Sequence, residues 1–233
     1  MAGAWHSWRA CLLWGIATLL VSQSFALVMP ESLAGAIPGA QVDNPVLAFE
    51  FARTPAHLEA IFGFPDDPLR EARIGGMIAG NLLDYLFMVV YGSFVLAFFG
   101  ASARATGESR WWFAGWLGPL AALSDAIENA LLLSINADMT APETELMFLP
   151  YPVWIKFALL AAACGLAGWA LVRQRGGPLA LPCLVAPAMI FPGVLDPWTW
   201  GQPAVSAIAL GWIAMLAWAA WRVWRARRLR TTA

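Results

Sequence analysis

The chain has few of the side chains that hold metals or act as nucleophiles. Its 233 residues include three cysteines, Cys11, Cys164 and Cys183, and none of them belongs to a Cys-x-x-Cys pair. Disulfides and thiolate metal sites are therefore not predicted. Its two histidines, His6 and His57, lie outside the long apolar stretches. A haem held by two intramembrane histidines is thus disfavoured.

Charge is also scarce. Only 12% of the residues are charged and 60% are hydrophobic, whereas roughly 25% charged residues is usual in a soluble domain. The net charge is −1, and the one dense basic run, Arg222 to Arg230, directly follows an apolar stretch. Arginines in that position pair with anionic headgroups and orient a membrane protein. The composition predicts contact with membrane lipids and no binding of nucleic acid.

Six apolar stretches approach the length of about 20 residues that a helix needs to cross a bilayer. They run approximately from Cys11 to Val28, Ile74 to Gly100, Trp111 to Ile135, Pro152 to Val172, Pro178 to Leu195 and Pro203 to Trp221. We therefore predict an all-α, polytopic membrane helix bundle that forms a single domain over residues 1–233. The fifth stretch contains Pro182, Pro187 and Pro192, so we expect it to be kinked or broken.

The basic residues predict the orientation, because lysine and arginine accumulate in short cytoplasmic loops. If the N-terminus is cytoplasmic, the arginines that flank the spans are cytoplasmic at every crossing. These residues are Arg9, Arg104, Arg110, Arg173, Arg175 and the five arginines from Arg222 onward. Both termini are then cytoplasmic. Arginine in large excess over the single lysine, with much alanine, is typical of a bacterial chain, so we expect a multi-pass protein of the bacterial inner membrane.

The first apolar stretch has two interpretations. Arg9, the apolar run that follows it and the small-residue sequence Ser24-Phe25-Ala26 also resemble a cleaved signal peptide. We favour an uncleaved helix, because apolar character continues through Leu27, Val28 and Met29. N-terminal sequencing distinguishes the two, since cleavage would leave a mature chain that begins at Leu27.

One sizeable segment, Pro30 to Arg73, lies between the first two predicted spans and is expected to be extracytoplasmic. Within it, Thr54 and Pro55 are typical of the N-cap and first position of a helix. The side chains of Leu58, Ile61 and Phe62 would form one apolar face of that helix. We expect a short helix on the outer membrane surface, in which His57 is an ordinary exposed or packed side chain rather than a ligand.

Polar residues interrupt two neighbouring spans at helical spacing. Residues three or four apart share a helix face, which gives one stripe of Asn81, Asp84 and Tyr85 and a second of Asp125, Glu128 and Asn129. Carboxylates in a bilayer are costly and usually face the interior of a bundle. Because a short loop joins the two spans, they are expected to pack side by side and to place both stripes in one pocket in the outer half of the membrane.

Three carboxyls in this setting need a counter-charge. Lys156 follows the outer end of the fourth span by about one turn, and it is predicted either to reach one acid or to extend toward the headgroups. No cofactor is predicted. A shared proton or a divalent cation at Asp84, Asp125 and Glu128 would resolve the remaining charge, since oxygen ligands suit hard cations.

The motif pattern resembles a group of small uncharacterised bacterial integral-membrane proteins. It consists of Asp84-Tyr85-Leu86-Phe87 with Tyr91 and Gly92, then Asp125-Ala126-Ile127-Glu128-Asn129, after an outer helix that opens with Arg53-Thr54-Pro55. The resemblance covers roughly Phe49 to Lys156. It implies the same topology and the same polar residues, and it implies no particular reaction.

Three functions remain open from the sequence. The first is a protein that binds or transports a cation, a proton-coupled solute or a small lipid-like ligand at the acidic residues. The second is a membrane-embedded enzyme that acts on a lipid or isoprenoid through Asp125 or Glu128, although we lean away from an enzyme. The third is an accessory subunit whose polar stripes bind another membrane protein. A purely structural alternative is that protonated acids hydrogen-bond between helices and fix their register.

Overall fold

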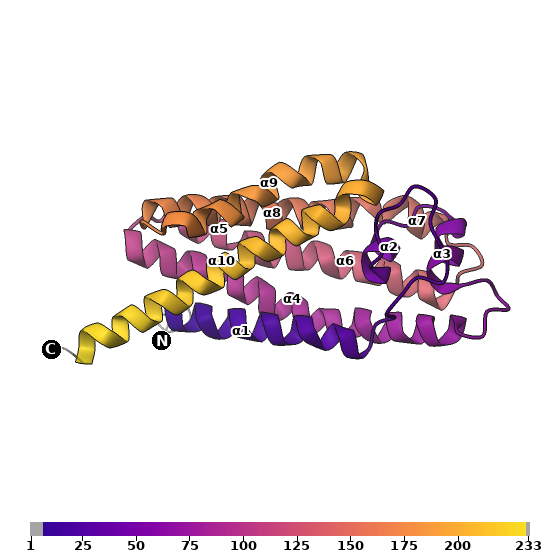
Figure 1. The fold of residues 1–233 in the computed structure, drawn as a ribbon, viewed down its shortest axis with the longest axis horizontal. Helices are drawn as coiled ribbons and strands as arrows, with labels where there is room; N and C mark the ends of the chain where they lie inside the picture. Colours follow the sequence, from indigo (N-terminus) through magenta and orange to yellow (C-terminus); the bar gives the residue numbers. More distant parts are fainter. Residues whose placement is uncertain (1–6, 232–233) are drawn as a thin grey trace.

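The computed structural model describes residues 7–231 as a long bundle of helices (Figure 1), and no strand occurs among them. The prediction of an all-α bundle is confirmed. In chain order the elements are α1 (Trp8–Ser24), η1 (Phe25–Leu27), α2 (Pro45–Glu50), α3 (Pro55–Phe62), α4 (Arg70–Thr106), α5 (Arg110–Gly115), α6 (Leu117–Ala137), α7 (Glu143–Phe148), α8 (Pro150–Arg173), η2 (Gly177–Leu179), α9 (Ala180–Leu195) and α10 (Pro197–Thr231).

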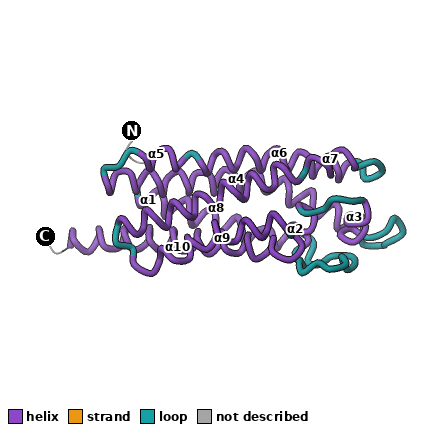
Figure 2. Tube along the Cα trace, turned by 90° about the horizontal axis from the view of Figure 1, so that it is seen from above, coloured by secondary structure: helices purple, strands orange, loops and turns teal. Residues whose placement is uncertain are grey.

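The long helices lie side by side and the short elements gather at the two ends. The two chain ends lie at one end of the bundle, while α2, α3 and their loops lie at the other (Figures 1 and 2). Helix α4 packs against α1 and α6, and α8 packs against α6 and α9. Helix α10 packs against α9 and α1. The chain thus forms a bundle with one short-helix cap, which α2 and α3 make.

Five segments are long and apolar enough to cross a membrane. They are Trp8–Leu27, Arg70–Thr106, Glu143–Arg173, Gly177–Leu195 and Pro197–Leu229. The third predicted span, from Trp111 to Ile135, is divided between α5 and α6, which are separated at Trp116. Its acids and asparagines also lower the mean hydropathy of α6, so that α6 is not among the five.

Helix α9 is continuous despite its prolines. Pro187 and Pro192 lie inside the helix. The helix is therefore not broken, although a break was one of the two outcomes that its prolines predicted. Two glycines of α8 let α9 come close: a Cβ at Gly165 would lie 2.8 Å from the Pro187 ring, and one at Gly168 would lie 2.9 Å from Leu184. Small residues allow this close packing of neighbouring helices.

The α2–α3 cap is anchored by aromatic side chains. The Phe51 ring stacks on Trp154 of α8 with centroids 5.5 Å apart, and Phe49 makes an edge contact with Phe62 at 5.0 Å. Phe49, Phe51 and Phe62 are fully buried. Their burial, at about 1.5–3 kcal/mol for each large apolar side chain, holds the cap onto the end of the bundle.

Helices α4 and α6 approach each other closely at Gly118. A Cβ there would lie 2.7 Å from the Cβ of Val95 and 2.8 Å from the carbonyl oxygen of Gly92. Because a backbone oxygen of a packed helix cannot move aside cheaply, we expect Gly118→Ala to destabilise the fold by about 1–3 kcal/mol. Thermal unfolding in detergent measures the change. Gly75→Ala on α4 is the matched control, since no atom lies within 4 Å of its added Cβ. An equal effect of both changes would contradict the proposed contact.

Candidate functional site

Lys156 lies at the centre of a buried group of acids. Its side chain, on α8, is within ion-pair distance of three carboxylates: Nζ lies 2.7 Å from Glu128 Oε2, 3.1 Å from Asp125 Oδ1 and 3.2 Å from Glu50 Oε1. Only 5% of Lys156 is exposed. Of the two predicted orientations, the lysine therefore takes the inward one, and it pairs with three acids instead of one. We call these four residues the acid–lysine cluster.

Helices α6 and α8 bring two of the acids to the lysine. Asp125 and Glu128 lie three residues apart on α6, so that both face the same neighbour. The two helices are joined near this point by the hydroxyl of Ser124, which donates a hydrogen bond of 2.8 Å to the Pro152 carbonyl. Glu128 is fully buried and Asp125 is 3% exposed.

The third acid, Glu50, comes from the cap. Helix α2 begins at Pro45 and is capped by Asn44, whose side-chain oxygen accepts hydrogen bonds from the backbone N–H groups of Val46 and Leu47. Glu50 is the last residue of α2, and it is 8% exposed. Sequence reasoning placed it with the outer charges and missed it. The Asn44-Pro45 pair, which has the same form as Thr54-Pro55, was the available signal for a helix here.

Arg53 is a second cation of the cap. Its Nη1 donates to the carbonyl oxygens of Glu50 and Ala52, at 3.1 and 2.5 Å, while its Nη2 is buried without a hydrogen-bond partner among the described residues. Burial lowers the pKa of Arg53 to about 10, and the negative charge of Glu128 opposes that shift. The charge of Glu128, a member of the acid–lysine cluster, therefore acts on Arg53.

His57 packs within the cap. Its Nδ1 accepts a hydrogen bond of 3.1 Å from the backbone N–H of Arg53, and its ring packs edge-on against Trp198 at 4.8 Å. Partial burial, and then the charge of Arg53, lower the pKa of His57 below 6.5. The neutral imidazole that accepts this hydrogen bond is thereby favoured.

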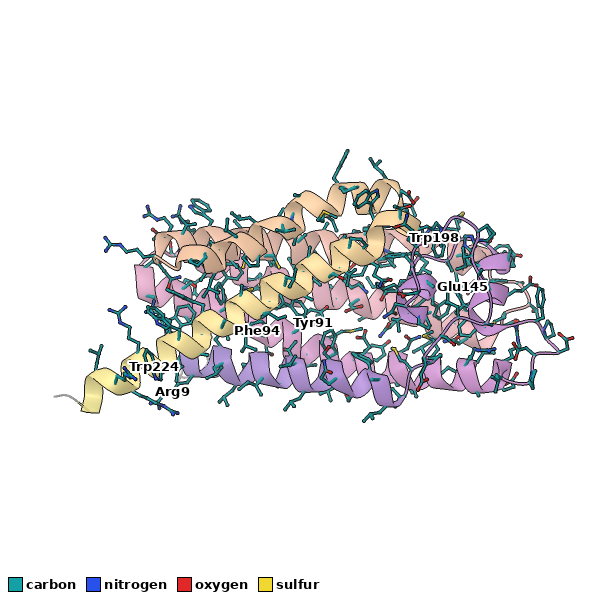
Figure 3. The ribbon with its side chains drawn as sticks, in the orientation of Figure 1. Arg9, Tyr91, Phe94, Glu145, Trp198 and Trp224 are labelled. Carbon is teal, nitrogen blue, oxygen red and sulfur yellow. The ribbon has the colours of Figure 1, made fainter. Side chains whose placement is uncertain are left out.

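A second set of contacts links α4 to α6. The side-chain amide of Asn129 donates to Asp84 Oδ2 at 2.9 Å and to the backbone carbonyl of Asn81 at 3.0 Å. The hydroxyl of Tyr91 donates to Asp125 Oδ2 at 2.9 Å. Tyr91 lies inside the bundle, about midway between Arg9 at one end and Glu145 at the other (Figure 3).

The structure brings together most of the residues that the sequence singled out. The two polar stripes and the lysine meet between α4, α6 and α8. The residues that contact one another there are Asn81, Asp84, Asp125, Glu128, Asn129 and Lys156. Asp84 is half-buried. Tyr85 is not part of this arrangement: it is 38% exposed on the side of α4. Tyr91, six residues further along α4, contacts Asp125 instead.

The acid–lysine cluster carries more negative than positive charge. Three carboxyls share one ammonium group, and Glu50 Oε2 and Asn81 Nδ2 are buried without hydrogen-bond partners among the described residues. Buried polar atoms of this kind are costly unless they are satisfied. Burial raises the pKa of Glu50, against the effect of Lys156, which lowers it. A proton on one carboxyl would remove charge and supply a missing donor.

The residues proposed for a divalent cation are arranged differently from a metal site. No group of three or more His, Cys, Asp or Glu side chains that could hold a metal ion occurs within residues 7–231. The Lys156 ammonium lies between Asp125 and Glu128, and the Asn129 amide lies against Asp84. The cationic position among these oxygens is thus filled by the protein's own lysine.

Comparison of the chain with protein-family models, with curated proteins and with solved structures gives no match.

Proposed function

We propose that this chain is an integral membrane protein that takes up and releases a proton at the acid–lysine cluster, and that the proton is coupled to binding or movement of a small solute or lipid-like ligand. One observation carries the proposal: three carboxyls, each at least 92% buried, share the single ammonium of Lys156. Even with the nearby Arg53, two positive charges face three carboxyls, so we expect one carboxyl to hold a proton.

A proton suits the geometry better than a metal ion. A metal would have to displace the Lys156 ammonium, which already lies 2.7–3.2 Å from three carboxylate oxygens. A proton needs no such displacement, because it can be shared between neighbouring oxygens. Glu50 comes from the α2–α3 cap at the end of the bundle, so it is the acid that we propose exchanges the proton with the outside.

We propose six membrane spans, one more than the five long apolar segments. We infer that α6 is a sixth span, because its 21 residues lie between α4 and α8 and its buried polar residues face those helices. We also propose cytoplasmic termini and a bacterial inner membrane. Both chain ends lie at one end of the bundle, with Arg9 and Trp224 (Figure 3), and arginines favour the cytoplasmic side.

The burial of the acid–lysine cluster supports binding over an accessory role. An accessory subunit would present its polar stripes outward, whereas Asn81, Asp125, Glu128 and Asn129 are each 3% exposed or less. An enzyme that acts on a lipid remains an alternative, since half-buried Asp84 and exposed Tyr85 would be its contact with the bilayer. The resemblance to small bacterial membrane proteins stays a prediction.

Potentiometric titration of the purified protein between pH 9 and 5 tests the proposal. We expect the wild type to take up about one proton more than the Glu128→Gln variant, because the excess acid is removed. Glu145→Gln is the matched control, because it removes a carboxyl that accepts a hydrogen bond from the Ser134 hydroxyl at the surface. This variant should take up as many protons as the wild type over the neutral range. Identical curves for the wild type and Glu128→Gln would contradict proton exchange at this site.

A further inference from the structure

A polar pocket lies at the opposite end of the bundle from the cap, where three long helices end or pass. Its volume is about 300 Å³ and it is lined by Ala105, Thr106, Glu108, Arg173, Gln174 and Arg222. The first two belong to the last turn of α4, Arg173 ends α8, and Arg222 lies on α10. The acid–lysine cluster uses none of these residues. We call this site the arginine pocket.

Its only carboxylate is already paired. Glu108 accepts hydrogen bonds from Arg173 Nη2 at 2.9 Å and from Arg110 Nε at 2.8 Å. Those hydrogen bonds, Arg173 first, lower the pKa of Glu108. With Glu108 ionised, the lining arginines Arg173 and Arg222 leave the pocket with a surplus of one positive charge. Arg110, which pairs with Glu108 from outside the lining, adds a further positive charge nearby.

Arg222 is held in place by the surrounding side chains. Its Nη1 donates to Gln174 Oε1 at 3.0 Å, and Gln174 in turn donates to Ser102 Oγ at 3.2 Å. Its guanidinium group lies over the rings of Trp8 and Trp218, at 5.0 and 5.7 Å. A guanidinium fixed by stacking loses little freedom when it binds an anion, and its planar fork matches phosphate oxygens.

The position of the pocket indicates where the anion comes from. The pocket lies between the ends of apolar helices, beside the exposed arginines and tryptophans of the last turns of α10. In these turns the guanidinium of Arg225 lies 5.2 Å from the ring centroid of Trp221, and that of Arg228 lies 4.1 Å from the ring centroid of Trp224. Such residues lie at the headgroup level of a membrane. Basic pockets between the ends of membrane helices suit anionic lipid headgroups.

We propose that the arginine pocket binds the phosphate of an anionic phospholipid, with Arg173 and Arg222 as its two donors. The helix ends that line the pocket also gain from nearby arginines, because the C-terminus of a helix carries partial negative charge. Stabilisation of the helix ends requires no lipid. The experiment below distinguishes this role from lipid binding.

Native mass spectrometry of the full chain in mild detergent tests the proposal with dioleoylphosphatidylglycerol, dioleoylphosphatidylcholine and inorganic phosphate as probes. We expect retention of phosphatidylglycerol in preference to phosphatidylcholine, and no retention of inorganic phosphate. Arg173→Gln should weaken the phosphatidylglycerol complex about tenfold, as loss of one charged hydrogen bond does. Because the Arg173 side chain is 55% exposed, this change should leave the fold intact, and circular dichroism checks that it does.

Arg225→Gln is the matched control: it removes the same charge from an exposed arginine of α10, at the same end of the bundle and outside the pocket. It should weaken the complex less than twofold. Equal losses in the two variants would mean diffuse attraction to the arginine tail and would overturn the proposal. Retention of inorganic phosphate, or equal retention of the two lipids, would overturn the assignment to an anionic phospholipid.

Discussion

Replacing Lys156 with methionine is expected to destabilise the protein by about 3–5 kcal/mol at pH 8, the usual loss when one partner of a buried ion pair is removed. The change would leave Glu50, Asp125 and Glu128 buried beside an apolar side chain. At pH 5 the loss should be smaller. The folded variant would then bind more protons than the unfolded chain, so its stability falls as the pH rises.

Thermal unfolding in detergent at pH 5 and pH 8, followed by circular dichroism, measures both effects of Lys156→Met. Arg9→Met is the control, because Arg9 is an exposed cation of α1 far from the cap. It should alter stability little and equally at both pH values. A Lys156→Met variant that melts like the wild type at pH 8 would mean that the ammonium does not hold the three carboxyls together.

The converse change should show the opposite dependence on pH. In a variant with Glu50→Gln, Asp125→Asn and Glu128→Gln together, the ammonium of Lys156 stays buried with no carboxylate within ion-pair distance. We expect a loss of about 3–5 kcal/mol at pH 7. Since an unpaired buried ammonium releases its proton more readily than an exposed one, the loss should shrink as the pH rises toward 10.

A single substitution distinguishes the effect of removing excess negative charge from the effect of losing all the ion pairs. Glu50→Gln alone should cost much less than the triple change, because Asp125 and Glu128 still pair with the lysine at 3.1 and 2.7 Å. A triple carboxamide change at Asp138 and Glu143, which are exposed, and at Glu145, which is half-buried, is the matched control. The account would be wrong if the buried triple variant were as stable as the wild type at pH 7, or if it lost stability further at high pH.

The sequence was sufficient to find the two polar stripes. Spacings of three and four residues place Asp125, Glu128 and Asn129 on one face of α6, and the structure turns that face toward α4 and α8. The same spacing could not separate Tyr85 from Tyr91. Both lie near the stripe on α4, and the packing of α6 leaves Tyr85 exposed while Tyr91 reaches Asp125.

Glu50 could not be located by the same reasoning. It lies in a segment rich in loops, where an acid is expected to be solvated, and its burial depends on contacts with residues distant in the sequence. The stacking of Phe51 on Trp154 and the pairing with Lys156, which is 106 positions away, fix it. Tertiary packing of this kind carries no periodic signal. The division of the third predicted span at Trp116 was likewise not evident from apolar content alone.

Infrared spectroscopy of the protein in detergent detects whether the acid–lysine cluster holds a protonated carboxyl near neutral pH. The carbonyl stretch of a protonated carboxyl is distinct from that of a carboxylate, and few other acids of a folded protein are protonated at pH 7. We expect such a band in the wild type at pH 7, its decline as the pH is raised, and its loss in Glu128→Gln. Absence of the band at pH 7, or its persistence unchanged in both Glu128→Gln and Glu50→Gln, would contradict this expectation.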